Sequence, residues 1–178
     1  YTWYVPHNPK GLMEAMGGKN MFMEKLDTLF EKNLYWHGNE PCHQIAYLYN
    51  ETGQPWKTQK YVRHILDTEY GDSPGGLAGN DDAGQMSAWY VFSSLGFYPV
   101  CPGADEYAIG TPLFKNAVIH LENGKDVCID ACNLENEEGA LDIFISDMKL
   151  NNKNWNENFI RYSDLIKGAK IQFKMSGT

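Results

Sequence analysis

The sequence is poor in basic residues and has no long apolar run. Its 178 residues include 15 Lys and Arg against 23 Asp and Glu, which gives a formal net charge of −8. Binding to phosphates requires clusters of Lys or Arg, and their absence argues against a nucleic-acid partner. A membrane-spanning helix needs roughly 18 consecutive apolar residues, and no such run occurs. The acidic chain is better suited to carbohydrate or to a cationic partner, and no membrane span is expected.

Several motifs of metal, redox and nucleotide sites are also missing. The four cysteines lack CxxC spacing, which excludes zinc and redox motifs, and we expect them to be buried thiols. No GxSxG, phosphate-loop or dinucleotide fingerprint is present. The sequence thus excludes several common enzyme classes. The cysteines are Cys42, Cys101, Cys128 and Cys132.

The first segment, Tyr1 to His7, carries two candidate residues. Trp3 and His7 could line a sugar subsite, although a lone Trp or His more often serves in packing. The sequence has neither a starting Met nor a signal-like stretch, and this segment reads as the interior of a structural element. We therefore expect the chain to be a fragment of a longer protein.

The sequence does contain enough apolar material for a substantial core, with 43% hydrophobic and 13% aromatic residues. Apolar residues at helical spacing predict helices up to about residue 100, and short alternating runs predict strands after it. The predicted fold class is α+β, with a helical segment over residues 1–102 and a β-rich C-terminal module over residues 103–178. The predicted helices cover about residues 19–32 and 84–95, with two more beginning at Asn39 and Gln54, and the predicted strands cover 107–109, 117–121, 127–131, 141–145 and 169–173.

Two adjacent carboxylates, Asp81 and Asp82, stand in a glycine-framed turn, Gly79-Asn80-Asp81-Asp82-Ala83-Gly84-Gln85, just before the last predicted helix. Glycine on both sides allows backbone conformations closed to other residues and the close approach of a ligand. One of the two acids could simply cap the helix with a side-chain oxygen. Capping needs only one acceptor, however, and the second carboxylate adds repulsion that a hard cation such as calcium would relieve. Helix capping and calcium binding both remain open interpretations of this turn.

The second candidate site is the loop Trp36-His37-Gly38-Asn39-Glu40-Pro41-Cys42-His43-Gln44, which places a carboxylate, an amide and two imidazoles at the start of a helix. His37 and His43 lack the spacing and the third soft ligand of a zinc site. The oxygens of Asn39 and Glu40 are suited to calcium. The alternative is an ordinary helix start, with Asn39 as the cap and Glu40 favoured by the helix dipole.

Several of these motifs together resemble the glycoside hydrolase family 92 α-mannosidases. The resemblance implies the C-terminal part of an (α/α)6 helical toroid followed by a β-strand-rich module. It further implies calcium-dependent, inverting exo-hydrolysis of α-mannosides in glycans such as N-glycans, and an extracytoplasmic location (periplasmic, surface or secreted). It covers residues 1 to about 120, and the strand region continues it more weakly. The motifs, in order, are Tyr1 to His7, Gly38-Asn39-Glu40-Pro41, Tyr47-Leu48-Tyr49-Asn50, Gly53 to Gln59, and Gly79-Asn80-Asp81-Asp82 through Pro99.

The resemblance also implies roles for particular residues. An inverting glycosidase needs an acid on the leaving oxygen and a carboxylate base that activates water, about 6.5–9.5 Å apart. The resemblance places the base in the acidic pair, with Asp82 favoured and Asp81 as the alternative. The general acid would be a glutamate upstream of Tyr1, in the missing N-terminal part of the parent chain. The implied substrate contacts are His37, Asn39, Glu40 and Trp3, and the implied calcium ligands are Asn39, Glu40 and Asp81.

Two further function classes remain open at this point. The chain could be a non-catalytic module that binds calcium or glycan, or a purely structural module. Because the general acid would lie upstream, we expect the chain to be inactive alone even if the parent is an enzyme. The residues upstream in the parent gene distinguish these cases, since a glutamate there supports catalysis.

Overall fold

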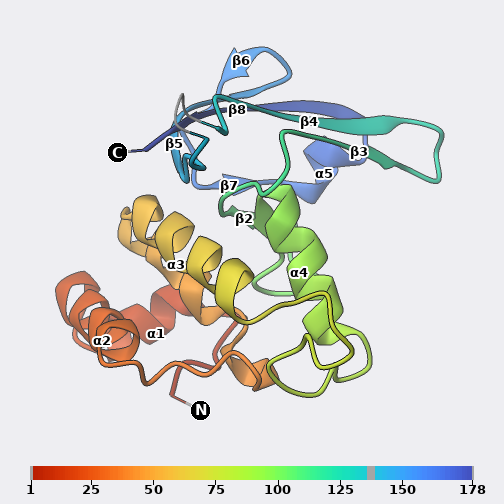
Figure 1. The fold of residues 1–178 in the computed structure, drawn as a ribbon. Helices are drawn as coiled ribbons and strands as arrows, with labels where there is room; N and C mark the ends of the chain where they lie inside the picture. The colour runs from red at the N-terminus through yellow and green to blue at the C-terminus, as the bar shows by residue number, and fades with distance from the viewer. Residues whose placement is uncertain (1, 136–138, 178) are drawn as a thin grey trace.

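The computed structural model describes residues 2–135 and 139–177, so that Tyr1 of the first motif lies outside the described residues. The helices of the first half lie together on one side of the molecule, and the larger sheet lies on the other (Figure 1). This segregation of helices and strands confirms the predicted α+β class. The helices are α1 (Pro9–Ala15), α2 (Lys19–Glu31), α3 (Pro55–Thr68), α4 (Gln85–Leu95) and α5 (Tyr162–Leu165), with two 3-10 helices, η1 (Glu40–Cys42) and η2 (Ile45–Thr52).

The starts of three of the four predicted helices are confirmed within one residue, as α2, α3 and α4. The prediction was wrong for the segment after Asn39, which forms the two 3-10 helices in place of one α-helix. η2 is buried on nearly all sides, and Asn50 Nδ2 donates to the Ile109 carbonyl at 2.8 Å. Contacts with other elements therefore override the local preference. α1 was not predicted, although Asn8 before Pro9 is a helix start, and its Oδ1 accepts from Gly11 N at 2.9 Å.

The strands form two sheets. A three-stranded sheet has the order β1-β2-β7, and a five-stranded sheet has the order β3-β4-β8-β5-β6. Neighbouring strands are antiparallel except β4 and β8, which are parallel. The strands are β1 (Phe97–Tyr98), β2 (Tyr107–Ile109), β3 (Asn116–His120), β4 (Asp126–Cys132), β5 (Phe144–Leu150), β6 (Lys153–Asn154), β7 (Phe159–Ile160) and β8 (Ala169–Ser176).

The predicted strands correspond to β2, β3, β4, β5 and β8, but β5 begins at Phe144, three residues after the predicted start. Residues before it bond outside the ladder, since the Ile143 carbonyl accepts from Thr111 Oγ1 at 2.8 Å. The expectation of buried thiols was wrong for Cys128 and Cys132, which are exposed. Alternation along β4 turns Val127, Ile129 and Ala131 inward and therefore turns both cysteines outward.

The helical part and the sheets share an apolar core. Phe92 and Leu95 of α4 pack against the same buried cluster as the strands of the larger sheet. Polar contacts also cross between the two parts: Arg63 Nη2 of α3 donates to the Pro112 carbonyl at 2.9 Å, and Ile145 N of β5 donates to Gln59 Oε1 at 3.1 Å. A division of the chain at residue 102 stays a prediction. Because α4 packs into the core that the helices and sheets share, the position of the turn before α4 is also fixed.

Candidate active site

Two segments far apart in the sequence meet before the start of α4. We call residues 79–85 the acidic turn and residues 36–43 the histidine loop. A Cβ on Gly79 would lie 2.8 Å from Gly38 Cα, and a Cβ on Gly38 would lie 2.7 Å from the Ala78 carbonyl oxygen. No side chain fits at either position without displacing backbone. Gly79 was expected to allow the close approach of a ligand, but it allows the close approach of the histidine-loop backbone. The two candidate sites are therefore adjacent and are treated as one.

The acidic turn has an unusual backbone. Asp82, Ala83 and Gly84 all have left-handed conformations, with φ values of 51°, 56° and 97°. Such a conformation costs a residue with a Cβ about 1 kcal/mol or more. Two backbone hydrogen bonds hold the turn against this strain, from Gln85 N to the Asp82 carbonyl at 3.3 Å and from Met86 N to the Asp81 carbonyl at 3.0 Å. Strain maintained in this way is typical of functional sites.

The two acids of this turn have different surroundings. Asp81 Oδ1 accepts hydrogen bonds from Ser87 Oγ at 2.6 Å and from Ser87 N at 3.0 Å, in the first turn of α4. These bonds lower the pKa of Asp81. The N-cap residue of α4 is Gly84, so neither acid stands at the predicted cap position, but Asp81 still accepts from an amide of the first turn. The Asp82 side chain is exposed and makes no hydrogen bond to any residue in the described ranges. One carboxylate thus holds the helix and the other faces solvent.

His37 lies at the centre of the histidine loop and is 0% exposed. Its Nδ1 is 2.7 Å from Tyr35 Oη, and its Nε2 is 2.7 Å from Tyr70 Oη. Burial, with a smaller effect of His43, lowers the pKa of His37 to about 3. Since both ring nitrogens contact tyrosines beneath the surface, this arrangement supports a positioning role for His37 more than the predicted direct contact with a sugar.

His43 links the histidine loop to the acidic turn. It is 1% exposed, and its Nε2 donates to the His37 carbonyl at 3.0 Å, while Gln85 Nε2 lies 3.4 Å from its Nδ1. Burial lowers the pKa of His43, whereas the bond to His37 and the charges of Glu40 and Asp82 oppose that change. The negative charges of Glu40 and Asp82 therefore both raise the pKa of the His43 imidazole. The arrangement brings Glu40 of one loop and Asp82 of the other to one region of the surface.

Asn39 and Glu40 are both exposed beside this histidine pair. Asn39 stands at the N-cap position of η1, as the helix-start alternative expected, but its side chain accepts from no N–H of that helix. Its Nδ2 contacts Cys42 Sγ at 3.8 Å, which leaves Oδ1 without a partner among the described residues. Trp3 is half-buried, with its ring against Phe22 at 5.3 Å between centroids. Trp3 is thus anchored in packing and has only part of its surface available to a ligand.

The donor atoms at the site fit a hard cation in type. The Asn39 amide oxygen, the Glu40 carboxylate and the second oxygen of Asp81 are oxygen ligands of the kind that calcium prefers. Calcium usually takes six to eight such ligands, and within the described ranges no group of three or more His, Cys, Asp or Glu side chains converges on one point. Calcium binding by these residues stays a prediction.

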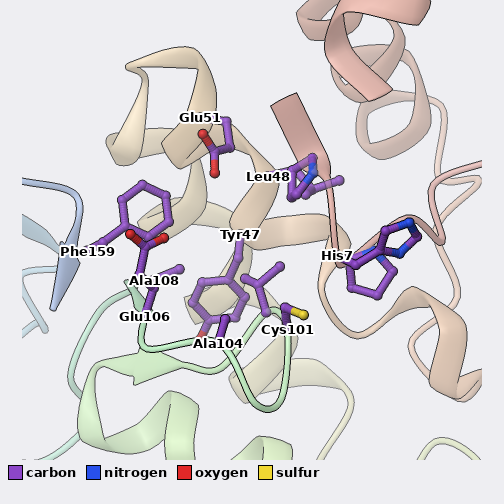
Figure 2. A pocket seen from close by; sticks show the side chains of 12 residues that line it. His7, Tyr47, Leu48, Glu51, Cys101, Ala104, Glu106, Ala108 and Phe159 are labelled. Atoms are coloured by element: carbon purple, nitrogen blue, oxygen red, sulfur yellow. The ribbon is translucent and has the colours of Figure 1, made fainter. Parts of the chain in front are cut away.

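A separate cavity of about 130 Å³ lies between the first segment, η2 and the loop before β2. Figure 2 shows the carboxylates of Glu51 and Glu106 turned toward it, beside the rings of Tyr47 and Phe159. Burial raises the pKa of Glu51, and the charge of Lys10 opposes that change. No residue of the acidic turn or the histidine loop lines this cavity. The cavity is therefore not part of the candidate site.

The buried His37 predicts a particular dependence of stability on pH. Its pKa is lower in the folded state, about 3 against an ordinary 6.5, so the unfolded chain binds more protons. Stability should therefore fall as the pH decreases from 6.5 toward 3, with a loss of about 2 kcal/mol between pH 7.5 and pH 5 from this one group.

Urea unfolding of the chain at the two pH values measures this loss. His37→Gln should reduce the pH dependence by about that amount, whatever its effect at pH 7.5. An equal pH dependence in the wild type and His37→Gln would contradict the prediction.

Comparison with known proteins identifies the family of the chain. A sequence profile described as the glycosyl hydrolase family 92 catalytic domain matches residues 1–177. The chain belongs to glycosyl hydrolase family 92. This confirms the resemblance drawn from the sequence motifs.

Among the described residues, every helix is too short or too polar to span a bilayer.

Solved structures of this family are similar to the chain throughout. A family GH92 α-mannosidase from Bacteroides thetaiotaomicron is 41% identical with a TM-score of 0.92, covering 99% of this chain and 24% of that one. A second structure of it contains mannoimidazole. A family GH92 inverting mannosidase from the same organism is 37% identical with a TM-score of 0.88, covering 100% of this chain and 27% of that one.

A curated relative from Arthroderma benhamiae is described as an uncharacterized secreted glycosidase. It is 29% identical over 174 residues, which are 97% of this chain and 22% of the relative. The GH92 chain therefore spans about a quarter of the length of the relatives that it matches.

Three residues that shape this GH92 site were not found by sequence reasoning. Ser87 supplies both donors to Asp81, Gln85 joins His43 to Tyr98 Oη at 2.9 Å, and Tyr70 holds His37. Ser87 lies six residues after Asp81, beyond the usual reach of a capping pattern. The partners of Gln85 and Tyr70 are distant in sequence, and no periodicity indicates them.

Proposed function

We propose that this chain is the C-terminal part of a calcium-dependent, inverting exo-α-mannosidase, with its helices completing an (α/α)6 toroid. One observation carries the proposal: Asp82 is exposed and has no hydrogen-bond partner among the described residues, and it lies in a strained turn beside the histidine loop. One solved relative is described as an α-mannosidase and another as an inverting mannosidase, and one structure of the first contains mannoimidazole. Mannose-containing glycans are the proposed substrate.

In the proposed mechanism Asp82 is the general base. Its carboxylate removes a proton from a water molecule that attacks the anomeric carbon on the face opposite the leaving group. Asp81 is less suited to this role, because its Oδ1 already accepts two bonds from Ser87. Its bond to the first turn of α4 holds Asp82 in place.

The chain's own oxygens provide the remaining contacts in the proposal. Asn39, Glu40 and Asp81 would hold calcium, and the first two would also contact the sugar. When bound, calcium would hold sugar hydroxyls and favour the distorted ring of the transition state. Trp3 would contact substrate with the exposed part of its ring. His37 is buried and would position its neighbours without touching the sugar.

The general acid is proposed to come from the N-terminal part of the parent chain. An inverting site needs two carboxyl groups about 6.5–9.5 Å apart on opposite faces of the sugar. The N-terminal part is thus the main partner of this chain, and the chain alone should not hydrolyse mannosides. An extracytoplasmic location is also proposed, in line with the secreted relative.

Proton NMR of the reaction products tests this function. The complete enzyme is incubated with an α-mannoside, and the anomeric signals are followed from the first minutes. β-Mannose should form first and then mutarotate. Initial α-mannose would contradict inversion, and absence of hydrolysis by the complete protein would favour a non-catalytic calcium- or glycan-binding module.

Calcium should raise the melting temperature of the chain if its oxygens bind the ion. A ligand that binds only the folded state stabilises it, by about 2.7 kcal/mol at a concentration 100 times its Kd. Thermal unfolding is measured with calcium, with magnesium and with a chelator.

The matched variants for this titration are Glu40→Gln and Glu122→Gln. Glu122 is exposed in the turn between β3 and β4, away from the histidine loop. Glu40→Gln should remove most of the calcium shift, and Glu122→Gln should retain it. A shift that is equal in both variants would place the ion elsewhere.

A further inference from the structure

A line of hydrogen bonds runs beneath the surface from the histidine loop to α4. Tyr35 Oη is 2.7 Å from His37 Nδ1, and His37 Nε2 is 2.7 Å from Tyr70 Oη. Tyr70 Oη also lies 3.0 Å from the carbonyl oxygen of Met86, in the first turn of α4. The Met86 amide in turn donates to the Asp81 carbonyl. The line therefore ends at the acidic turn.

The distances favour one direction for the protons. If His37 carries its proton on Nε2, it donates to Tyr70, which donates to Met86, while Tyr35 donates to His37 Nδ1. If His37 instead carries its proton on Nδ1, it donates to Tyr35, and Tyr70 donates to His37 Nε2 in place of Met86. Tyr35 can then donate only to the Cys42 carbonyl, at 3.5 Å. A contact of 3.0 Å is within the normal range of hydrogen bonds, whereas 3.5 Å is beyond it. The first arrangement keeps all three bonds short.

Ring packing keeps this line rigid. The rings of His37 and His43 stack with centroids 4.6 Å apart, and Trp89 lies against His37 at 4.3 Å. Tyr70 stacks on Trp89 with an angle of 3° between the planes. Trp89 Nε1 also donates to the His43 carbonyl at 2.9 Å. α4 thus holds the histidine loop through a side chain as well as through the bonds of His37.

We propose that His37 is a positioning residue, which as its Nε2–H tautomer connects Tyr35, Tyr70 and Met86 and so fixes the acidic turn relative to the histidine loop. The hydrogen-bonded line is a property of this chain. Its effect on catalysis rests on the proposed function, because the turn carries the proposed base and the loop carries Asn39 and Glu40. A displacement of about 1 Å in such groups can lower a rate about 100-fold.

The first experiment determines the tautomer in the wild-type chain, so it does not depend on a variant that folds. The histidines are labelled with 15N, and long-range proton–nitrogen spectra are recorded near neutral pH. His37 should be protonated at Nε2 and should accept a hydrogen bond at Nδ1. Protonation at Nδ1 alone would overturn the proposal.

The second experiment uses Tyr70→Phe, which keeps the ring and removes the hydroxyl. The Met86 and Ser87 amides should exchange with solvent about five- to tenfold faster, since one internal hydrogen bond contributes about 1 kcal/mol. Tyr90→Phe is the matched control. The Tyr90 ring packs on Tyr70 at 5.0 Å, but its hydroxyl has no hydrogen-bond partner among the described residues. Equal exchange in the two variants would overturn the proposal.

The same variants separate this inference from the proposed function. In the complete enzyme, Tyr70→Phe should lower kcat about tenfold or more with little change in KM, and Tyr90→Phe should change neither by more than about twofold. If the wild-type enzyme hydrolyses no mannoside, the proposed function fails while the tautomer and exchange results still decide the role of His37. If the enzyme is active and Tyr70→Phe leaves kcat unchanged, the positioning role fails.

Discussion

Asp82→Asn in the complete enzyme is expected to lower turnover by about 10²–10⁴-fold, the usual contribution of a general base. The amide cannot accept the proton of the attacking water. Folding should be little affected, because the Asp82 side chain is exposed and makes no hydrogen bond within the described ranges. The measurement is kcat on an α-mannoside, together with the melting temperature of the same preparation.

Asp81→Asn is the matched variant for this experiment. It weakens the bonds to Ser87 and should lower the melting temperature, because an amide in the first turn of α4 loses its charged acceptor. Its turnover should fall less than that of Asp82→Asn. The opposite ranking would exchange the roles of the two acids. Unfolding of Asp82→Asn with unchanged specific activity in the folded fraction would mean that neither carboxylate acts as proposed.

Gly79→Ala is expected to have the largest effect on the structure of the site. A Cβ at this position would lie 2.8 Å from Gly38 Cα and 3.0 Å from Gly38 C, and backbone cannot move aside as a flexible side chain can. Overpacking of this kind costs about 1–3 kcal/mol. The acidic turn and the histidine loop should separate, and activity of the complete enzyme should fall with stability.

Gly75→Ala provides the control, since Gly75 lies in the same loop and a Cβ there would meet nothing within 4 Å. Its stability should stay within about 0.5 kcal/mol of the wild type. Urea unfolding of the three chains gives the comparison. Equal midpoints for Gly79→Ala and Gly75→Ala would show that the two segments are not held in contact through their glycines.

Local patterns were sufficient to predict most of the elements but not how the site is assembled. Apolar spacing and turn residues located α2, α3, α4 and most of the strands, because these features act over a few residues. The same local reasoning singled out Asn39 and Glu40 as calcium ligands, and that assignment stays a prediction. The failures have a common cause: η2 is a 3-10 helix and β5 starts late because their groups bond to residues distant in sequence.

The difference in surroundings between the two acids of the pair is visible only in the structure. Adjacent aspartates are equivalent in sequence, and only the bonds of Asp81 to Ser87 distinguish it from Asp82. Similarly, His37 and Trp3 were predicted as ligand contacts from their residue types, whereas burial at 0% and packing on Phe22 determine what each can reach. The meeting of Gly38 with Gly79 is a tertiary contact that no single segment reveals.

The position of β8 has a consequence for how the protein is made. β8, from Ala169 to Ser176, lies between β4 and β5, so both of these earlier strands pair with it. During synthesis, β4 and β5 leave the ribosome before their shared neighbour exists, and each then exposes an unpaired edge. The larger sheet can close only after residue 176 has emerged. Until then the edges of β4 and β5 that β8 covers are open to pairing with strands of other chains.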